Sequence, residues 1–298
     1  MKKKSFGPLL ILLAGIFWGS MGLFVRHLQT LGFTAVQITS VRLRLAAVCF
    51  CLILLARDPK GFRIRSRDIP LFLGLGLASI LFFTLCYFTA ISMMPLSTAA
   101  ILLYTSPIWV MLLSVLFLHE RLDRTKLLAL ALAFGGCVLV SGIGGGGLTV
   151  AGLLIGLGAG VGYGLYSILG TVALRRYSPL TVTAYTFAVA GLGSCFLCTP
   201  PQILGMIRDA APAHAPVLVA LFFLLTALIT AVIPFLAYTL GLRSVEASRA
   251  AILATVEPMV ATLFGILVFA EPLTLPSGLG ILLILAAVVL LNRPAGKK

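Results

Sequence analysis

The residue whose chemistry stands out in this sequence is Glu257, an acidic side chain inside a long apolar run. At about 1.5 Å per helical residue, it lies about 15 Å from the start of the run at Ala247. In a lipid bilayer, an ionisable group at that depth costs about 2.5–3.5 kcal/mol, so it predicts a functional site. Binding of a substrate amine and proton coupling are the two functional interpretations. The structural alternatives are a pairing with an arginine, or a protonated carboxyl bonded to a neighbouring helix.

Two basic residues, Arg42 and Arg44, lie inside another apolar run. On a helix, two residues correspond to about 200° of rotation, so the two side chains cannot share a face. One of them can line a cavity, where it would attract a carboxylate or pair with Glu257. The other must snorkel towards water or pack against a helix. The spacing alone leaves open which of the two faces the cavity.

Four aromatic residues in apolar runs form two pairs at equivalent positions of an internal repeat, Trp18 with Tyr163 and Tyr87 with Tyr238. Paired positions at the interface between two repeats are natural linings of a central substrate cavity. Packing, or anchoring at the membrane surface, is the alternative role for each of them. We therefore treat all four as candidate cavity residues.

Two prolines, Pro107 and Pro258, also occupy equivalent positions inside apolar runs. A proline inside a helix leaves a backbone carbonyl without its usual partner and bends the helix. Symmetric bends predict hinges for a gating motion, although bent packing without motion is equally compatible with them.

The sequence offers no constellation for catalysis. His27, His119 and His214 lie at the ends of apolar runs or in loops, without metal-ligand spacing. Cys195 and Cys198 have the C-x-x-C spacing, but neither a second cysteine pair nor nearby acidic residues accompany them. We expect no catalytic residues, no metal site and no cofactor, and hence a protein that is not an enzyme.

The composition of the whole chain indicates a membrane protein, whose apolar runs are surrounded by lipid. Hydrophobic residues make up 60% of the 298 and charged residues 10%, and the mean hydropathy is +1.15; soluble domains have about 25% charged residues. Only helices and closed barrels satisfy the backbone inside a bilayer, and the long continuous runs favour helices over alternating strands. The runs predict an all-α protein with ten spans at Phe6–Val25, Ala35–Ala56, Pro70–Ser92, Ser97–Leu118, Leu127–Ile143, Leu148–Ala173, Pro179–Cys198, Pro216–Leu242, Ala247–Ala270 and Pro276–Leu291.

The distribution of Lys and Arg predicts the orientation. If the N-terminus is cytoplasmic, 18 basic residues fall on the cytoplasmic side and only Arg26 and Arg208 fall outside, as the positive-inside rule expects. Both termini are then cytoplasmic, and the cell inner membrane is the expected location. The net charge of +14 is explained by basic loops on one side of the lipid bilayer, which is an expected partner. No nucleic acid is expected as a partner.

The chain contains an internal repeat. Shifting Tyr87–Leu122 by 151 residues onto Tyr238–Leu273 gives 11 identities in 36 positions, and near the start of each half the shift is 145 residues. The repeat predicts two five-helix units, 1–145 and 146–298. Because five is odd, the units enter the membrane from opposite sides. Inverted repeats of this kind are typical of secondary transporters that work by alternating access.

With these motifs the chain resembles the drug/metabolite transporter superfamily, in its EamA-type ten-helix branch. The resemblance covers essentially the whole chain and rests on the following segments: Trp18-Gly19, Arg42-x-x-x-Ala46, the Pro107 helix that ends in His119-Glu120-Arg121-Leu122, Glu257-Pro258, and Phe269-Ala270-Glu271-Pro272-Leu273. It implies a central cavity lined by both halves, with the fifth and tenth helices peripheral. It also favours Arg42 over Arg44 as the cavity residue, because Arg44 is not part of the usual pattern.

The resulting expectation is a carrier that exports a small, amphipathic metabolite such as an amino acid by alternating access. Proton coupling through Glu257 and facilitated transport both fit. A carrier of a phosphorylated or lipid-linked sugar is the alternative within transport, since two arginines would favour phosphate. A receptor or scaffold without turnover is the alternative from another class. A small-molecule substrate is the expected partner, and a homodimer stays open.

Overall fold

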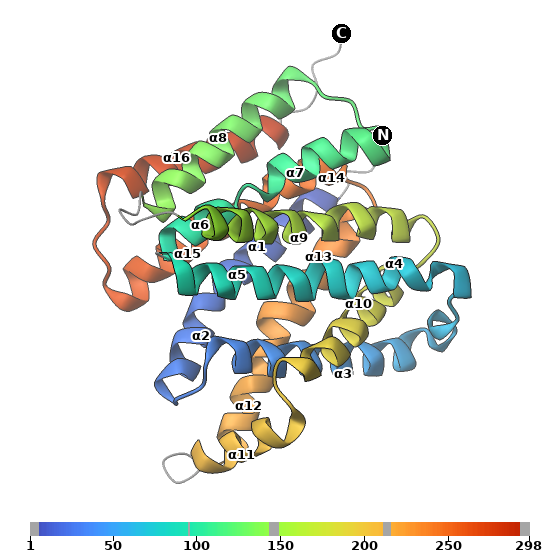
Figure 1. Ribbon diagram of the computed structural model, residues 1–298. Coiled ribbons are helices and arrows are strands. Elements are labelled where there is room, and N and C mark those ends of the chain that lie inside the picture. The colour runs from blue at the N-terminus through green and yellow to red at the C-terminus, as the bar shows by residue number, and fades with distance from the viewer. Residues whose placement is uncertain (1–5, 95, 143–148, 211–215, 293–298) are drawn as a thin grey trace.

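The computed structural model describes residues 6–94, 96–142, 149–210 and 216–292. Within these residues every regular element is helical, and ten helical segments are long and apolar enough to cross a membrane. All ten predicted spans are present, so the expectation of an all-α membrane protein with ten transmembrane helices is confirmed (Figure 1). The predicted boundary between the halves, at residues 145 and 146, lies outside the described residues.

The first five spans are built from eight α-helices and two π-helical segments. Their bounds are α1 (Gly7–Gly19) with α2 (Met21–Thr30); α3 (Ala35–Arg57); α4 (Ile69–Leu73) with the π segment Gly74–Leu81 and α5 (Phe82–Met93); α6 (Leu96–Leu103) with α7 (Ser106–Leu113) and the π segment Ser114–Leu118; and α8 (Arg124–Ser141).

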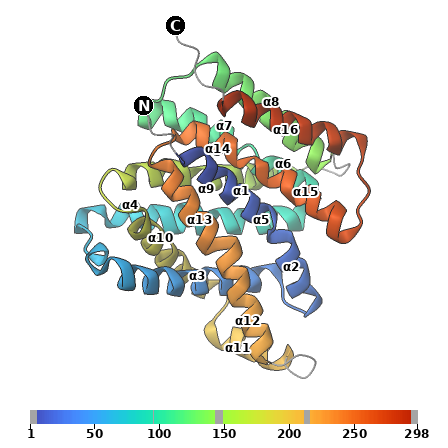
Figure 2. The ribbon, with the colours of Figure 1, turned by 180° about the vertical axis from the view of Figure 1, so that it is seen from behind.

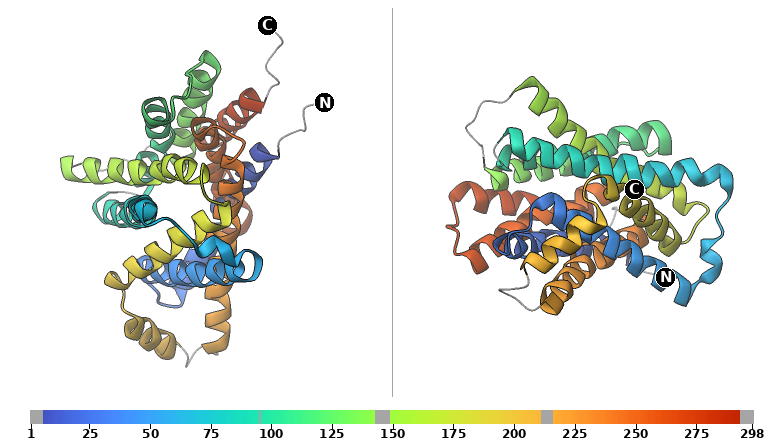
Figure 3. Two further views of the ribbon diagram at one scale, coloured as in Figure 1. Left: turned by 90° about the vertical axis from the view of Figure 1, so that its right-hand side faces the viewer. Right: turned by 60° about the horizontal axis from the view of Figure 1, so that its bottom comes forward.

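The second five spans follow the same plan. Their bounds are α9 (Val150–Leu174); α10 (Pro179–Gly193) with the 3-10 turn Ser194–Phe196; α12 (Pro216–Ala227) with the π segment Leu228–Val232 and α13 (Ile233–Leu242); α14 (Ala247–Ala254) with α15 (Val256–Phe269); and α16 (Leu275–Asn292). Between the seventh and eighth spans, Pro200–Ala210 forms the helix α11. The hydrophobic runs predict no helix here, because the segment lies between the predicted spans Pro179–Cys198 and Pro216–Leu242. Its helix lies at one end of the molecule with the start of α12 (Figures 1 and 3).

The internal repeat is visible in the irregular parts of the helices. The fourth span is interrupted between α6 and α7, and the ninth between α14 and α15. Both spans then end in a residue with left-handed backbone conformation, His119 at φ 57° and Ala270 at φ 54°, which are 151 residues apart. The next amide in each case donates to a carbonyl six residues back, Glu120 to Ser114 and Glu271 to Gly265. The two repeats therefore share local geometry that propensity alone would not impose.

Two glycines let the first helix of each half approach the interrupted helix of the other half. A Cβ on Gly15 would lie 3.1 Å from the Ala254 carbonyl oxygen, and a Cβ on Gly160 would lie 3.4 Å from the Leu103 carbonyl oxygen. The glycines are 145 residues apart and the carbonyls 151, as the repeat predicts. Small residues at helix crossings are the usual device for close packing in membranes, and here they place α1 and α9 against the helix breaks.

The fifth and tenth spans, α8 and α16, pack against each other at one edge of the molecule (Figures 1 and 2). They meet closely at Gly136 and Gly280, where a Cβ on either residue would lie 2.7 Å from the other's carbonyl oxygen. The remaining eight spans surround the centre, where the breaks of the fourth and ninth spans lie. The fifth and tenth helices are therefore peripheral, as expected.

Candidate functional site

Glu257 lies in the first turn of α15, directly after the break in the ninth span. The helix α14 ends at Ala254, and Thr255 has φ −66° and ψ 0° before α15 begins at Val256. The free amides of a helix N-terminus carry a partial positive charge, which favours a carboxylate there. The break therefore both exposes polar backbone at the centre of the bundle and positions the acidic side chain.

Tyr163 from α9 is the direct partner of this carboxylate. Its hydroxyl donates to Glu257 Oε2 at 2.8 Å. Its ring contacts Trp18 at 6.1 Å and Phe83 at 5.4 Å between centroids. Glu257, in the second half, is thus bonded to a tyrosine whose ring packs against two aromatic side chains of the first half.

Arg42 is near Glu257 without being its partner in an ion pair. The two side chains interact electrostatically, but no salt bridge joins them. Nη1 of Arg42 instead contacts the Met21 sulfur at 2.8 Å and the Thr230 hydroxyl at 3.5 Å. A thioether sulfur is a weak acceptor, and the contact with the hydroxyl is long. Its buried Nε has no hydrogen-bond partner among the described residues. A cation with unused donors deep in the bundle has capacity to bind an anion.

Tyr87, Tyr104 and Cys137 also lie within electrostatic range of Glu257. They come from α5, from the break between α6 and α7, and from α8. We call Glu257, Tyr163 and Arg42 the polar half-site. It is surrounded by helices of both repeats, and the other groups around it are uncharged hydroxyls and a thiol.

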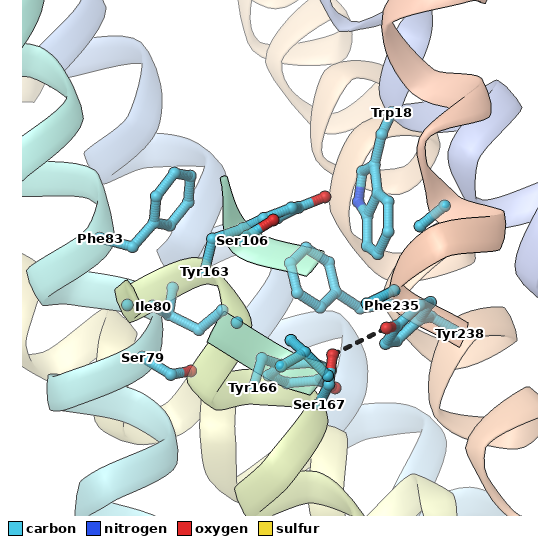
Figure 4. Close-up of a pocket in the computed structure, with 15 residues that line it drawn as sticks. Trp18, Ser79, Ile80, Phe83, Ser106, Tyr163, Tyr166, Ser167, Phe235 and Tyr238 are labelled. Atoms are coloured by element: carbon cyan, nitrogen blue, oxygen red, sulfur yellow. Dashed lines mark hydrogen bonds between the residues drawn. The ribbon is translucent and has the colours of Figure 1, made fainter. Parts of the chain in front are cut away.

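An aromatic pocket adjoins the polar half-site (Figure 4). Trp18 packs against Phe235 and Tyr238 at 5.0 and 5.3 Å between ring centroids, and the Tyr238 hydroxyl is bonded to Ser167 at 2.7 Å. Tyr163 lines this pocket as well as bonding Glu257. The space in it that water can occupy is about 20 Å³, which is room for about one water molecule. The pocket is therefore contracted, and a ligand needs it to open.

The repeat relates the polar half-site to positions with different chemistry. The shift of 151 residues takes Ser106 to Glu257, and the shift of 145 takes Trp18 to Tyr163. Ser106 and Trp18 both line the aromatic pocket. The shift of 145 takes Arg42 to Phe187, a fully buried side chain. Each half of the molecule thus contributes one charged group, Arg42 or Glu257, at a position where the other half contributes a neutral side chain.

The six predicted cavity residues fall into two groups. Trp18, Tyr163 and Tyr238 line the aromatic pocket together. Arg42 and Tyr87 lie within electrostatic range of Glu257, and these three residues form the second group. All six are thus near the centre of the bundle, and their role in binding stays a prediction.

The predicted hinge prolines lie just beyond the helix breaks. Pro107 is in the first turn of α7 and Pro258 in the first turn of α15. The prolines therefore begin new helical segments instead of bending continuous ones. That position suits proline, because the first-turn amides have no intrahelical partner to lose. The role of the two prolines as hinges stays a prediction.

Arg44 does not face the aromatic pocket. Its Nε donates to the Ser194 hydroxyl at 3.1 Å, and Nη2 donates to the carbonyls of Ser194, at 3.0 Å, and Cys198. These carbonyls end the seventh span, where a cation complements the negative end of the helix. The structure thus explains Arg44 as a cap for α10, and answers the question that its spacing from Arg42 left open.

A further buried carboxylate, Glu120, was missed as a candidate by the sequence analysis. It follows the fourth span and accepts hydrogen bonds from the amides of Ala247, at 2.7 Å, and Ser248, at 3.2 Å, and from the Ser248 hydroxyl. Lys126 lies 3.7 Å from Glu120 and 2.6 Å from Glu246. Glu120 thereby fastens the end of the fourth span to the start of the ninth.

Its counterpart after the ninth span is Glu271, which pairs differently. Glu271 forms an exposed salt bridge with Arg26 at 2.8 Å, and Arg26 also lies over the Phe269 ring at 4.3 Å. Because five spans separate the two loops, the two glutamates lie on opposite faces of the membrane. The two glutamates are among the identities that the 151-residue shift gives, so the sequence already makes them equivalent positions.

Comparisons with known proteins agree with this architecture. The sequence model of the EamA-like transporter family matches residues 5–142 and again residues 150–293. An uncharacterized transporter of Archaeoglobus fulgidus is 30% identical over 294 residues, covering 96% of both chains. A probable terminal-alkyne amino-acid exporter of Streptantibioticus cattleyicolor is 27% identical over 88% of this chain and 85% of its own length.

Two further similarities are more limited. A pseudopaline exporter of Pseudomonas aeruginosa is 31% identical over 134 residues, which is 45% of each chain. A crystal structure of a protein that is 18% identical superposes with a TM-score of 0.79 over 97% of both chains. At that identity the superposition supports the fold alone.

Proposed function

We propose, from the premise that the chain belongs to the EamA-like transporter family, that it exports an apolar amino acid or a similar amphipathic zwitterion. The observation that carries this proposal is the polar half-site beside the aromatic pocket. Glu257 and Arg42 are opposite charges that interact without pairing. A zwitterion can satisfy both, with its amine at Glu257 and its carboxylate at Arg42.

The aromatic pocket supports an apolar side chain as the other part of the substrate. Its lining includes Trp18, Phe83, Phe235 and Ile80, with few polar atoms. Sites for small molecules usually combine an apolar lining with a few placed polar groups. The relative that is named a probable terminal-alkyne amino-acid exporter agrees with an amino-acid substrate and with the outward direction.

Alternating access is the mechanism that we propose. In this conformation Glu120 holds the start of α14 against the end of the fourth span. On the opposite face, the pair of Glu271 and Arg26 is exposed. Breaking the Glu120 contacts, while the two repeats rock about the helix breaks, would open the face on which Glu120 lies.

The location and orientation follow from charge. The basic loops, such as the one that contains Arg63, Arg65 and Arg67, lie on one face of the molecule. We propose that this face is cytoplasmic and that the protein lies in the cell inner membrane, because Lys and Arg in short loops are retained on the cytoplasmic side. Glu120 would then close the cytoplasmic face.

A carrier of phosphorylated or lipid-linked sugars is the second candidate within transport. Two arginines inside a span favour phosphate binding, but Arg44 already donates hydrogen bonds to Ser194 at the end of α10. One cation beside a carboxylate suits a zwitterion better than a phosphate, since the carboxylate would repel a dianion. A receptor or scaffold without turnover would need no site of this kind at the centre of the bundle.

The test is efflux from proteoliposomes loaded with a panel of labelled amino acids and metabolites. We expect apolar amino acids to leave faster than acidic or phosphorylated compounds, and Glu257→Gln to abolish the difference. A pH gradient, applied to the wild type and to Glu257→Gln, separates proton coupling from facilitated transport. Efflux of sugar phosphates alone would contradict the proposal, as would no efflux of any amphipathic zwitterion.

A further inference from the structure

A basic pocket lies on the face that carries most of the arginines, away from the centre of the bundle. It encloses about 430 Å³ and is lined by Asp58, Lys60, Gly61, Arg63, Arg65, Arg176, Tyr177, Ser178 and Thr181. Two loops form it, the one between α3 and α4 and the one between α9 and α10, which lie side by side (Figures 1 and 2). The positive-inside rule explains basic residues in these loops, but it does not require them to enclose a cavity.

Hydrogen bonds hold the backbone of the basic loop in place. The Tyr185 hydroxyl donates to the Phe62 carbonyl at 2.7 Å, and the Arg65 amide donates to the Tyr177 hydroxyl at 3.1 Å. Asp68, at the end of the loop, accepts from Arg176 and from the Tyr177 hydroxyl, both at 2.6 Å. The loop is thereby fixed before any ligand binds, which lowers the entropy that binding would cost.

The cations of the pocket outnumber the acids that could neutralise them. Lys60, Arg63 and Arg65 form no ion pair within the described part of the chain. Asp58 is the single carboxylate in the lining, and Asp68 is already occupied by Arg176. A pocket in which three unpaired cations meet a single carboxylate favours an anion, and arginine is suited to phosphate oxygens.

A separate apolar groove lies deeper in the membrane-spanning region, between the same two helices, α3 and α10. It encloses about 470 Å³ between α3 and α10 and is lined by Arg44, Ala47, Val48, Cys51, Leu52, Ala188, Gly191, Leu192 and Cys195. We call it the α3–α10 groove. The large side chains at its rim are exposed, with Val48 at 55%, Leu52 at 59% and Leu192 at 72%. In a bilayer, this surface faces lipid.

The basic pocket and the α3–α10 groove are aligned along α3 and α10. Asp58 in the pocket follows Cys51 in the groove by seven residues, and Thr181 precedes Ala188 by seven. Seven residues are about two helical turns, or about 10 Å. Thr181 and Ala188 therefore share a face of α10, and Asp58 is the residue that directly follows the end of α3. Leu55 lies between Cys51 and Asp58 on α3 and is 58% exposed. A polar anion site thus has an apolar groove about 10 Å below it.

We propose that these two cavities bind one anionic phospholipid, with its phosphate headgroup in the basic pocket and an acyl chain along the α3–α10 groove. The alignment of the two cavities along α3 and α10, with the exposed Leu55 between them, is what favours a lipid over a free phosphate compound. Clusters of Lys and Arg next to a span attract anionic headgroups. This site is separate from the polar half-site and does not depend on the cargo.

The test is lipid binding to the full-length protein, measured by native mass spectrometry in detergent. Dioleoylphosphatidylglycerol is titrated against dioleoylphosphatidylcholine for the wild type and for the triple variant Lys60→Gln, Arg63→Gln, Arg65→Gln. We expect the wild type to prefer the anionic lipid and the variant to bind it at least about tenfold more weakly. The matched control is Arg121→Gln, Arg124→Gln, Arg243→Gln, which removes three exposed cations from the same face outside the pocket.

The control variant is expected to bind phosphatidylglycerol within about threefold of the wild type, since screened charges outside the pocket contribute little. An equal loss in both triple variants would overturn the proposal, because it would mean diffuse surface attraction. Glycerol phosphate separates the two sources of phosphate. If it displaces the lipid at equal concentration, the groove contributes nothing and the lipid assignment is wrong.

A variant of the groove tests the second half of the site. Ala188→Phe places a ring in the α3–α10 groove without changing any charge. We expect it to lower the binding of phosphatidylglycerol while leaving that of glycerol phosphate unchanged. Unchanged lipid binding in a correctly folded Ala188→Phe protein would contradict the placement of the acyl chain.

Discussion

The two repeats place the same backbone geometry around the centre of the molecule and fill it with different side chains. In the first repeat, the residue after the helix break is Ser106, and its partner position in α1 is Trp18. In the second repeat, the same positions hold Glu257 and Tyr163, which are joined by a hydrogen bond of 2.8 Å. The backbone at the helix breaks is thus the same in both repeats, whereas the side chains at these central positions differ.

This difference indicates which constraints act on each part. Gly15 and Gly160 are both retained because each packs against the carbonyls that precede a helix break. The side chains that face the centre contact no equivalent backbone, so they are free to diverge. In the proposed mechanism, the symmetric parts of the inverted repeat supply the motion and the asymmetric side chains supply the selectivity.

The comparison predicts that matched substitutions at Glu257 and Ser106 differ strongly. Losing one partner of a buried, charged contact costs about 2–5 kcal/mol, so Glu257→Gln should lower the rate of substrate efflux about 100-fold. Ser106→Ala should change it less than about threefold. Efflux from proteoliposomes is the measurement, with reconstitution checked by the amount of protein incorporated. Equal effects of the two substitutions would contradict the binding role that we give to Glu257 in the polar half-site.

The two glutamates that follow the fourth and ninth spans, Glu120 and Glu271, should also contribute unequally to the stability of the protein. Glu120 bonds the amides of Ala247 and Ser248 while buried, and hydrogen bonds to charged groups contribute about 1.5–3 kcal/mol each. Glu271 forms an exposed ion pair, worth about 0–1 kcal/mol. Thermal unfolding in detergent should show a clear loss for Glu120→Gln and little change for Glu271→Gln. A larger loss for Glu271→Gln would contradict the role given to Glu120.

The shared scaffold is tested by adding one methyl group. Gly15→Ala forces a side chain towards Val256 and the Ala254 carbonyl, and overpacking of this kind costs about 1–3 kcal/mol. Gly22→Ala is the control, because nothing lies within 4 Å of a Cβ there and alanine favours the helix by about 1 kcal/mol. Unfolding in detergent should therefore shift down for Gly15→Ala and stay level or rise for Gly22→Ala. A rise in both would mean that the α1 crossing is looser than the structure has it.

The smallest expected effect is at the hydroxyl of Tyr163. Tyr163→Phe removes the bond to Glu257 and keeps the ring contacts with Trp18 and Phe83. A hydrogen bond to a charged group contributes about 1.5–3 kcal/mol, but substrate can replace part of it. We expect the Michaelis constant for efflux to change about tenfold or less. No change in either kinetic constant would mean that the bond is structural only.

The sequence was sufficient for the ten spans and the repeat because hydrophobic runs and periodic identities are local signals. Glu257 was identifiable for the same reason, since a lone carboxylate in an apolar run has a physical cost. The contacts of Arg44 with Ser194 and Cys198 could not be derived, because they join residues 150 or more apart. Glu120 was overlooked since it lies at the end of a run, where acidic residues are ordinary. Its burial depends on α14, which only the tertiary structure brings to it.

The central claim is that the carboxylate of Glu257 binds the amine of the substrate. The most direct measurement is the binding of leucine and N-acetyl-leucine to the wild type and to Glu257→Gln by isothermal titration calorimetry. Acetylation removes the positive charge of the amine, so the wild type should prefer leucine strongly and Glu257→Gln should bind the two ligands about equally. The same preference in both proteins would mean that another group holds the amine, and would contradict the account.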